Sequence, residues 1–404
     1  MRFERLRNFA ANTWQPAVLY GGILAALGGL LFFRIGTLLP GYSSSEVQAY
    51  GASGGFRTIF ENPVDAPFTV VTHLLSLAND HSYLLTRLTA VGFGLAALVA
   101  FWWLLQHWYD RRVAAFGTIL FGCSALFLHI ARFGAPDVLM FLVIILVACG
   151  VWLKKSANPI AVFLCFAISA ALLYVPGMIW IVALGVAWQW RTIDRIFRQH
   201  LWLVTLGGLL LASALVPLGF ALYKTPDIWK TLVGLPAVGW PQVGEVLSNL
   251  YQIPMALFFR YVDASPETWL GNLAILDIFS IAMLFLGGYV FIKHARLQRV
   301  KLVGWAILAG IVLISLGGGV SLSLIIPFVY ILVAAGIGFL FVRWHEVFPR
   351  NPIAHILAFV LVTLAVVTAC SYQLRHYFIA WPRNAETRSV YTTPELPLSG
   401  TIQQ

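Results

Sequence analysis

Long, uninterrupted apolar runs dominate the sequence, and Val138–Leu153 and Ile353–Ala369 are two examples. Such runs are typical of helices that cross a membrane, whereas strands of membrane β-barrels alternate apolar and polar residues over about 10 positions. Only 10% of the 404 residues are charged, against about 25% in soluble domains. The sequence therefore predicts an all-α, polytopic membrane protein whose apolar surface is covered by lipid.

We expect eleven membrane spans. Residues 17–39 form an uncleaved first span, because this stretch is longer than the apolar region of a signal peptide. A break at Val175-Pro176-Gly177 divides one long apolar stretch in two, since an even number of spans must separate the basic clusters Lys154–Lys155 and Arg191–Arg198. The expected spans are 17–39, 88–106, 113–130, 137–153, 159–174, 177–190, 201–222, 273–293, 302–316, 321–342 and 353–372.

The charged residues indicate how the chain is oriented. With a cytoplasmic N-terminus, sixteen of the 26 Lys and Arg residues fall on the cytoplasmic side of this topology, as expected for a multi-pass protein of the plasma membrane. The net charge of +10 is explained by these short basic loops, so nucleic acid is not an expected partner. We expect a transmembrane domain over residues 1–372, with outer loops at about 40–87 and 223–272. An extracytoplasmic tail, 373–404, follows and ends in a TTPELPLSGTIQQ stretch that is expected to be disordered.

The first outer loop begins PGYSSSEVQAYG, and Glu46 lies just beyond the first span. Ser43, Ser44 or Ser45 is suited to cap a short helix here. One interpretation is that Glu46 is a carboxylate at the membrane surface that acts as a general base. The other is a solvated loop residue, or one favoured by the helix N-terminus.

A very short turn, RFGAPD, joins the third and fourth spans and places Arg132 and Asp137 at the outer boundary. Asp137 follows a proline and opens a helix, so the helix dipole alone is a sufficient reason for a carboxylate there. Arg132 can extend its guanidinium to the interface. Alternatively, the two charges orient a phosphate headgroup and a sugar.

Further polar groups lie in the outer loops, and the second loop is rich in aromatic residues that are typical of an interfacial belt or of a groove for a lipid-linked substrate. No HExxH, Walker A or DxD motif is present, and the four cysteines form no CxxC pair. No cofactor is predicted. The polar groups include Glu61, Asp65, His73, Asp80, His81 and Arg87 in the first loop, and Lys224, Asp227, Lys230, Glu245, Arg260, Asp263 and Glu267 in the second.

The order of these features resembles the GT-C membrane glycosyltransferases, in particular the dolichyl-phosphate-mannose protein mannosyltransferases and the bacterial aminoarabinose transferases. That branch has an acidic motif followed by a tyrosine after the first span, a Pro-rich segment, an RL opening the second span, and an R…D turn. This chain has SSSEVQAYG, then Asn62–Leu75 (NPVDAPFTVVTHLL), then Arg87-Leu88, then RFGAPD. The similarity covers roughly residues 34–153.

The acidic motif departs from that pattern, because the family commonly has Asp-Glu. If Glu46 matches the Glu, Ser45 replaces the Asp; if Tyr50 sets the register, Glu46 occupies the Asp position and Val47 the Glu position. One carboxylate is missing in either case. A divergent enzyme and an inactive relative both remain open.

The resemblance implies that a sugar leaves a polyprenyl phosphate and joins an acceptor protein, lipid or glycan on the outer face, with membrane lipid around the site. A base deprotonates the acceptor hydroxyl, and basic side chains stabilise the departing phosphate. The implied catalytic residues are Glu46 and Asp137. The implied substrate-binding residues are Arg132, Arg87, Tyr50, Asp65, His73 and Lys224.

Two other functions compete with this one. A transporter would place ionisable residues near the middle of its spans, but the expected spans are nearly free of charge apart from Arg34, late in the first. A non-catalytic subunit that binds a glycolipid or a protein partner is consistent with the missing carboxylate. Comparing position 46 and its neighbours among close relatives would distinguish a catalytic function from a non-catalytic one.

Overall fold

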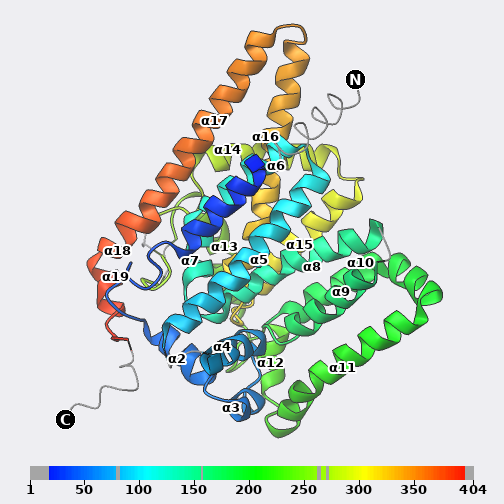
Figure 1. Cartoon of the computed structure of the whole chain (residues 1–404), viewed down its shortest axis with the longest axis vertical. Helices are drawn as coiled ribbons and strands as arrows, with labels where there is room; N and C mark the ends of the chain where they lie inside the picture. The colour runs from blue at the N-terminus through cyan, green and yellow to red at the C-terminus, as the bar shows by residue number, and fades with distance from the viewer. Residues whose placement is uncertain (1–17, 79–81, 156–157, 262–264, 270–272, 396–404) are drawn as a thin grey trace, which may run out of the picture.

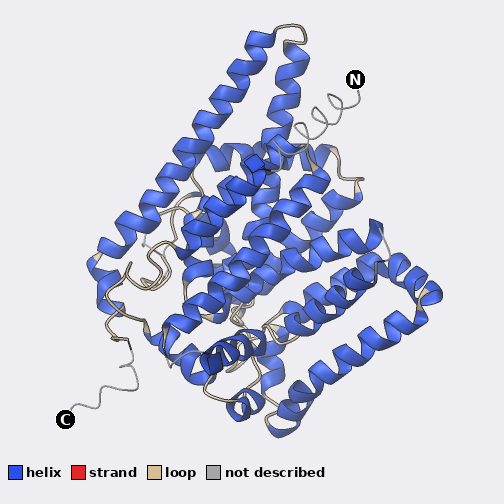
Figure 2. Ribbon diagram, viewed as in Figure 1, coloured by secondary structure: helices blue, strands red, loops and turns tan. Residues whose placement is uncertain are grey.

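The computed structural model describes residues 18–78, 82–155, 158–261, 265–269 and 273–395. Within these residues the chain is helical throughout, and the only β-type pairing is an isolated antiparallel bridge between Tyr42 and Thr393. The helices form one bundle (Figures 1 and 2). The expected all-α architecture is therefore confirmed.

Among the described residues, six helices are long and apolar enough to cross a membrane, and a seventh span results if two helices bent by 61° are counted together. Each of the eleven expected spans coincides with a helix, but several are too short or too polar to pass this test, so the count of eleven stays a prediction. The six are α5 (Leu84–Trp108), η1 with α8 (Pro136–Lys155), α11 (Leu201–Lys224), α15 (Gln298–Ser315), η2 with α16 (Leu322–Val347) and α17 continuing to Arg383 (Pro352–Arg383); the bent pair is α6 (Arg111–Cys123) and α7 (Ala125–Arg132).

Four further helices complete the comparison with the expected spans. The stretch around Gly177 is broken, as expected, because Gly177 adopts a φ of 74°, a left-handed conformation that ends one helix before the next begins. The two helices at this break are α9 (Pro159–Leu172) and α10 (Met178–Gln199). The other two are Val18–Phe32 and α14 (Ile278–Lys293).

The centre of the bundle depends on the close approach of α14 and α16. A β-carbon on Gly287 would lie 1.9 Å from the Leu332 carbonyl oxygen, and one on Gly336 would lie 2.1 Å from that of Met283. Only glycine fits at either position, as in other membrane helix pairs whose backbones touch. This contact makes α16 the buried centre around which α6, α15 and α17 are arranged.

The predicted outer segments contain more structure than the sequence indicated. The first loop folds into α2 (Ser44–Ala52), α3 (Phe56–Glu61) and α4 (Ala66–Ala78), and the second contains α12 (Ile228–Val233) and α13 (Val243–Phe258). In Figure 1, α2, α3, α4 and α12 lie at one end of the bundle, and the turn between α16 and α17 lies at the opposite end. This arrangement separates α2–α4 and α12 from a predicted cytoplasmic turn, whereas α13 lies within the bundle against α15.

The C-terminal segment is also ordered as far as Glu395, which corrects the expectation of disorder for the start of the TTPELPLSGTIQQ stretch. α17 continues through a π-helical turn, η3 (His376–Ala380), into α18 (Trp381–Arg383) and α19 (Ala385–Val390). The Thr393 backbone then pairs with Tyr42, and the Glu395 carboxylate accepts hydrogen bonds from Ser82 and from the Tyr83 N–H. Residues 396–404 lie outside the described residues.

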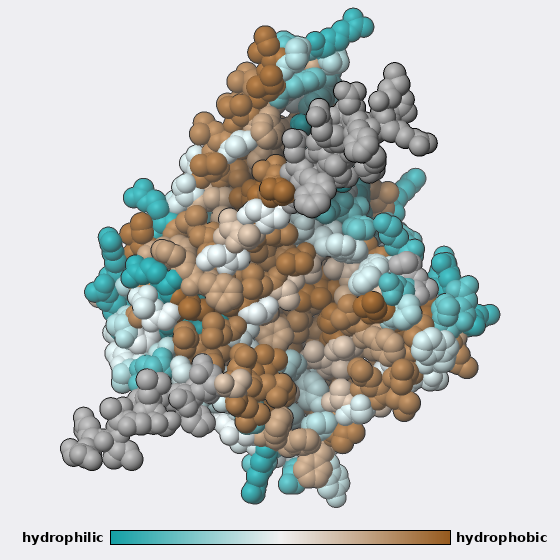
Figure 3. All heavy atoms as spheres, viewed as in Figure 1, coloured by the Kyte–Doolittle hydropathy of each residue, from teal (hydrophilic) through white to brown (hydrophobic). Residues whose placement is uncertain are grey.

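The surface agrees with a membrane environment. Hydrophobic residues cover most of the visible face, and hydrophilic ones gather towards its edges, among them the tip of the α16–α17 hairpin (Figure 3). α11 is buried over only 11% of its most apolar window. Most of its exposed side chains are apolar, so lipid is the solvent that this face requires.

Candidate functional site

Glu46 takes part in a helix cap and is also deeply buried. Ser43 is the N-cap of α2: its hydroxyl accepts a hydrogen bond from the Glu46 N–H, and the Glu46 carboxylate accepts one from the Ser43 N–H, at 3.0 Å. This reciprocal capping box fixes the side chain at the start of α2. Glu46 is 0% exposed, so it is not a solvated loop residue.

Arg87, in the first turn of α5, neutralises Glu46. Its Nε and Nη2 donate to the two carboxylate oxygens at 2.7 and 2.8 Å, and its remaining N–H groups bind the carbonyls of Ile35 and Gly41. The two-pronged geometry is the one that guanidinium and carboxylate groups favour. The sequence predicted a span that begins at residue 88, whereas α5 begins at Leu84. Arg87 therefore lies inside the helix rather than before it.

Gly134, in the RFGAPD turn, supplies a fourth hydrogen bond to Glu46 through its N–H, at 3.1 Å. A β-carbon at this position would lie 2.3 Å from the Thr86 hydroxyl. Glycine is therefore required for the turn to approach the carboxylate. Glu46 consequently joins α2, α5 and the turn after α7.

Arg132, the last residue of α7, lies on the other side of the same region and is 4% exposed. Its Nη1 and Nη2 donate to the carbonyls of Leu30 and Phe33 at 3.2 and 2.5 Å, at the C-terminal end of the first helix, where a cation is favourable. The rings of Tyr377 and Phe378 lie about it. Its Nε is buried without a hydrogen-bond partner.

These side chains meet in a small polar cavity of about 20 Å³, which we call the polar cavity. A volume of this size accommodates about one water molecule, so a larger ligand would have to bind at its mouth. It brings together three of the predicted site residues, Glu46, Arg87 and Arg132. It is lined by Ile35, Leu38, Leu39, Glu46, Arg87, His129, Arg132, Phe133, Glu267, Tyr377, Trp381 and Tyr391.

Two residues of the polar cavity were not singled out from the sequence. His129 lies one turn before Arg132 on α7, is 2% exposed and has an unpartnered Nε2. It stands within an apolar run, so no sequence pattern marked it as a site residue. Glu267 was noted only as one polar group of the second loop. The sequence feature that could have identified Glu267 is the nearby Trp269. This tryptophan is 1% exposed, and its ring lies 5.4 Å from that of His129.

Asp137 and Asp65 lie together beside the polar cavity rather than in its lining. Asp137 is in the first turn of η1, as expected, and its side chain hydrogen-bonds to Ser321. Asp65 precedes α4 with a φ of 58°, a left-handed conformation that is uncommon for aspartate. Burial, and then the negative charge of Asp137, raise the pKa of Asp65 to about 7.

The remaining predicted residues have separate places. Tyr50 packs edge-on against Tyr83, at 5.2 Å between ring centroids. The His73 Nδ1 lies 3.0 Å from the Ser53 carbonyl oxygen, so this histidine links α4 to the end of α2. Lys224 ends α11, is exposed and covers the ring of Phe220. None of the three lines the polar cavity.

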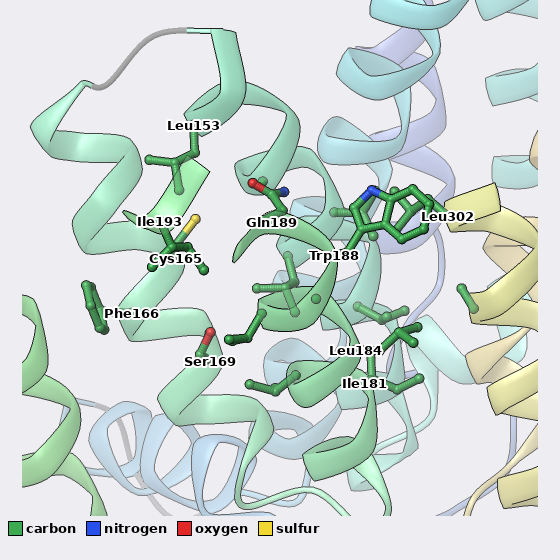
Figure 4. A pocket seen from close by; sticks show the side chains of 18 of the residues that line it. Leu153, Cys165, Phe166, Ser169, Ile181, Leu184, Trp188, Gln189, Ile193 and Leu302 are labelled. Carbon is green, nitrogen blue, oxygen red and sulfur yellow. The ribbon is translucent and has the colours of Figure 1, made fainter. Parts of the chain in front are cut away.

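A second, larger cavity of about 310 Å³ is apolar and lies among α8, α9, α10 and α15 (Figure 4). We call it the apolar cavity. Val143 on α8 lines this cavity and is six residues beyond Asp137, or about 11 Å along the axis of the 3-10 and α-helical segments that join them. The side chains in Figure 4 are mostly hydrocarbon, and the exceptions labelled there are Gln189, Ser169, Cys165 and the indole nitrogen of Trp188.

Comparison with known proteins adds to this geometry. The sequence matches no protein-family model and no curated protein. Among solved structures, it is similar to ArnT from Cupriavidus metallidurans in the apo state, with a TM-score of 0.54 and 14% identity over 94% of this chain and 77% of that chain. The same protein bound to undecaprenyl phosphate gives a TM-score of 0.56 and 14% identity over 93% and 77%. The expected resemblance is confirmed in the fold: the chain folds as the GT-C transferase ArnT does.

Proposed function

We propose that this protein is a membrane glycosyltransferase that moves a sugar from a polyprenyl-phosphate donor to an acceptor hydroxyl on the extracytoplasmic face. The observation that carries the proposal is the polar cavity, where Arg132 presents an unpartnered N–H next to buried carboxylates. The ArnT-like fold supports it, since one of the similar structures is described as bound to undecaprenyl phosphate.

The charges of the polar cavity suit a reaction whose leaving group is a phosphate. Arg87 is balanced by Glu46, whereas Arg132 binds only backbone carbonyls and ring faces. Arg132 therefore keeps a full positive charge for an anion. An N–H aimed at a phosphate oxygen stabilises the negative charge that develops as the sugar departs, and a buried, fixed donor does so without reorganising.

The hydrocarbon chain of the donor has a suitable place in the apolar cavity. A phosphate held near Arg132 would lie close to the start of η1, and Val143, in the lining of the apolar cavity, lies about 11 Å along the helix from Asp137. The apolar lining would accept an isoprenoid chain with little cost from unpaired polar groups.

Glu46 and Asp137 are the carboxylates that we proposed from the sequence as catalytic. The contacts of Glu46 add a positioning role, because four N–H groups bind its carboxylate and hold the start of α2 against α5. The same contacts favour the second candidate function, a non-catalytic glycolipid-binding subunit, since both oxygens of the Glu46 carboxylate are already occupied by N–H donors.

The test is a transfer assay with the full-length protein in proteoliposomes, using radiolabelled polyprenyl-phosphate sugars extracted from membranes. We expect label to move to an acceptor, and Arg132→Met to lower the rate at least about 100-fold, in line with the loss of one oxyanion donor. Arg57→Met is the matched control, because Arg57 is exposed and pairs only with Glu61 on its own helix. Donor binding without transfer would favour the non-catalytic subunit.

A further inference from the structure

Glu267 reaches the polar cavity from a distant part of the chain. Its carboxylate accepts hydrogen bonds from the Ser45 hydroxyl at 2.6 Å and the Ser44 hydroxyl at 3.2 Å, so it lies directly against the first turn of α2. More than 220 residues separate these partners in the sequence. A carboxylate from the second outer loop therefore stands beside Glu46, the residue that follows Ser45.

The backbone around Glu267 is held from two other directions. The Tyr391 hydroxyl donates to the Glu267 carbonyl at 2.6 Å, and the Trp381 indole N–H donates to the Pro266 carbonyl at 3.1 Å. Trp269, two residues further on, is fully buried and donates its indole N–H to the Leu273 carbonyl. Fixing the main chain on both sides of a side chain is how a protein holds a reacting group in place.

The surroundings of Glu267 also point to a ligand. Arg132 and His129, which are 4% and 2% exposed, each present an unpartnered buried nitrogen to the cavity that Glu267 lines. Buried nitrogens without partners are rare in folded proteins and call for an explanation such as a bound group. An anion at the mouth of the polar cavity would satisfy the Arg132 Nε, which can only donate, and also the His129 Nε2 in the tautomer that carries its proton there.

The two glutamates of the polar cavity differ in how accessible their carboxylates are to a substrate. Glu46 has no exposed surface and accepts four N–H groups, whereas Glu267 is half-buried and bound only by two hydroxyls. An acceptor hydroxyl can therefore reach Glu267 without breaking an ion pair.

We infer that Glu267 is a catalytic residue of the transfer proposed above, on which this inference rests. Its carboxylate removes the proton from the acceptor hydroxyl as that oxygen attacks the anomeric carbon. The new glycosidic C–O bond forms, the bond from the anomeric carbon to the phosphate oxygen breaks, and its electron pair leaves with the polyprenyl phosphate. The proton stays on Glu267 until it passes to water.

The test compares Glu267→Gln, Glu267→Asp and Glu245→Gln in the proteoliposome assay. Glu245→Gln is the matched control, because Glu245 is an exposed residue of the second loop and does not line the polar cavity. We expect Glu267→Gln to lower the transfer rate about 100-fold or more. Glu267→Asp should retain part of it, and Glu245→Gln should match the wild type.

Binding of undecaprenyl phosphate, measured by the shift in thermal unfolding midpoint, separates chemistry from structure. A proton acceptor acts on the sugar acceptor, so Glu267→Gln should bind this lipid as the wild type does. Two results would overturn the inference: transfer by Glu267→Gln within threefold of the wild type, or equal loss of binding in the Gln and Asp variants. A wild-type protein that transfers no sugar would instead remove the proposed function, and the inference with it.

Discussion

At the residue scale, the Glu46–Arg87 pair is the feature with the largest energetic consequence. Both side chains are almost completely buried. The Arg87 guanidinium donates hydrogen bonds to Glu46 and to backbone carbonyls. Removing one member of such a pair leaves an uncompensated charge in a medium that solvates it poorly. A substitution here changes stability as well as chemistry, so activity alone is an ambiguous readout of the role of Glu46.

Glu46→Gln should therefore destabilise the protein by about 3 kcal/mol, because Arg87 would remain charged and unpaired. Adding Arg87→Met should recover part of that loss, giving a coupling energy on the order of 2 kcal/mol in a double-mutant cycle. Denaturant titration of the purified variants measures both quantities. Additive effects would show that the two side chains do not interact energetically. Loss of transfer in the stabilised double variant would favour a chemical role for Glu46.

Asp65 provides a pH-dependent test at the same scale. Its pKa is raised from 3.8 to about 7 by burial and by Asp137, so the folded state binds the proton more tightly than the unfolded state. Stability is therefore lost as pH rises from about 4 to 7, with a slope of at most about 1.4 kcal/mol per pH unit.

Asp65→Asn removes this titration and keeps a residue that tolerates the left-handed backbone. We expect the variant to gain thermal stability relative to the wild type as pH rises from 5 to 7, and the difference to stay constant above that range. Unfolding midpoints at pH 5, 6, 7 and 8 provide the comparison. A difference that does not vary with pH would exclude an elevated pKa at Asp65.

At the element scale, the sequence located helices far better than it located their contacts. Long apolar runs and flanking charge predicted a helix at every expected span, and the run of serines predicted a cap of α2, which is confirmed at Ser43. Partners distant in the chain carry no local signal, so the meeting of α2 with the segment around Glu267 was not predicted. The ordered structure of the C-terminal segment was not predicted for the same reason, because its polar groups bind Tyr42 and Tyr83 rather than water.

The apolar cavity allows a prediction about the donor chain. Gly185 lines this cavity on α10, and a β-carbon there would meet only a Leu146 methyl group at 3.9 Å. Gly185→Phe should fill the cavity without straining the helix, and helix propensity improves when glycine is replaced. We expect transfer from long polyprenyl donors to fall about tenfold more than transfer from short ones, in line with lost burial of one or two isoprenoid methylene groups.

Gly208→Phe is the matched control, because a β-carbon on Gly208 in α11 would meet nothing within 4 Å. Transfer rates with donors of two chain lengths provide the measurement. An equal decrease for both donors in Gly185→Phe would place the chain outside the apolar cavity.

At the scale of the whole molecule, orientation in the membrane decides whether the site faces the donor. The sorting of Lys and Arg predicts a cytoplasmic N-terminus and an extracytoplasmic C-terminus, and the helices separate the α16–α17 turn from α2–α4 along the bundle (Figure 1). Ser389, in the C-terminal segment, and Arg350, in the α16–α17 turn, are exposed and suited to labelling.

A cysteine at Ser389 should react with a membrane-impermeant maleimide added to intact cells, and a cysteine at Arg350 should react only after the membrane is opened. The parent protein is its own control, since three of the four native cysteines are buried. The reverse pattern would place the polar cavity on the cytoplasmic side and remove the proposed reaction from the outer face.

A structure of the full-length protein with undecaprenyl phosphate would show whether the donor phosphate binds at the polar cavity. We expect a phosphate oxygen at about 2.8 Å from Nε of Arg132, with Glu267 facing the open side of that phosphate and the hydrocarbon chain running towards the apolar cavity. A phosphate held elsewhere, for example by Lys224 at the end of α11, with the Arg132 Nε still unpartnered, would contradict it.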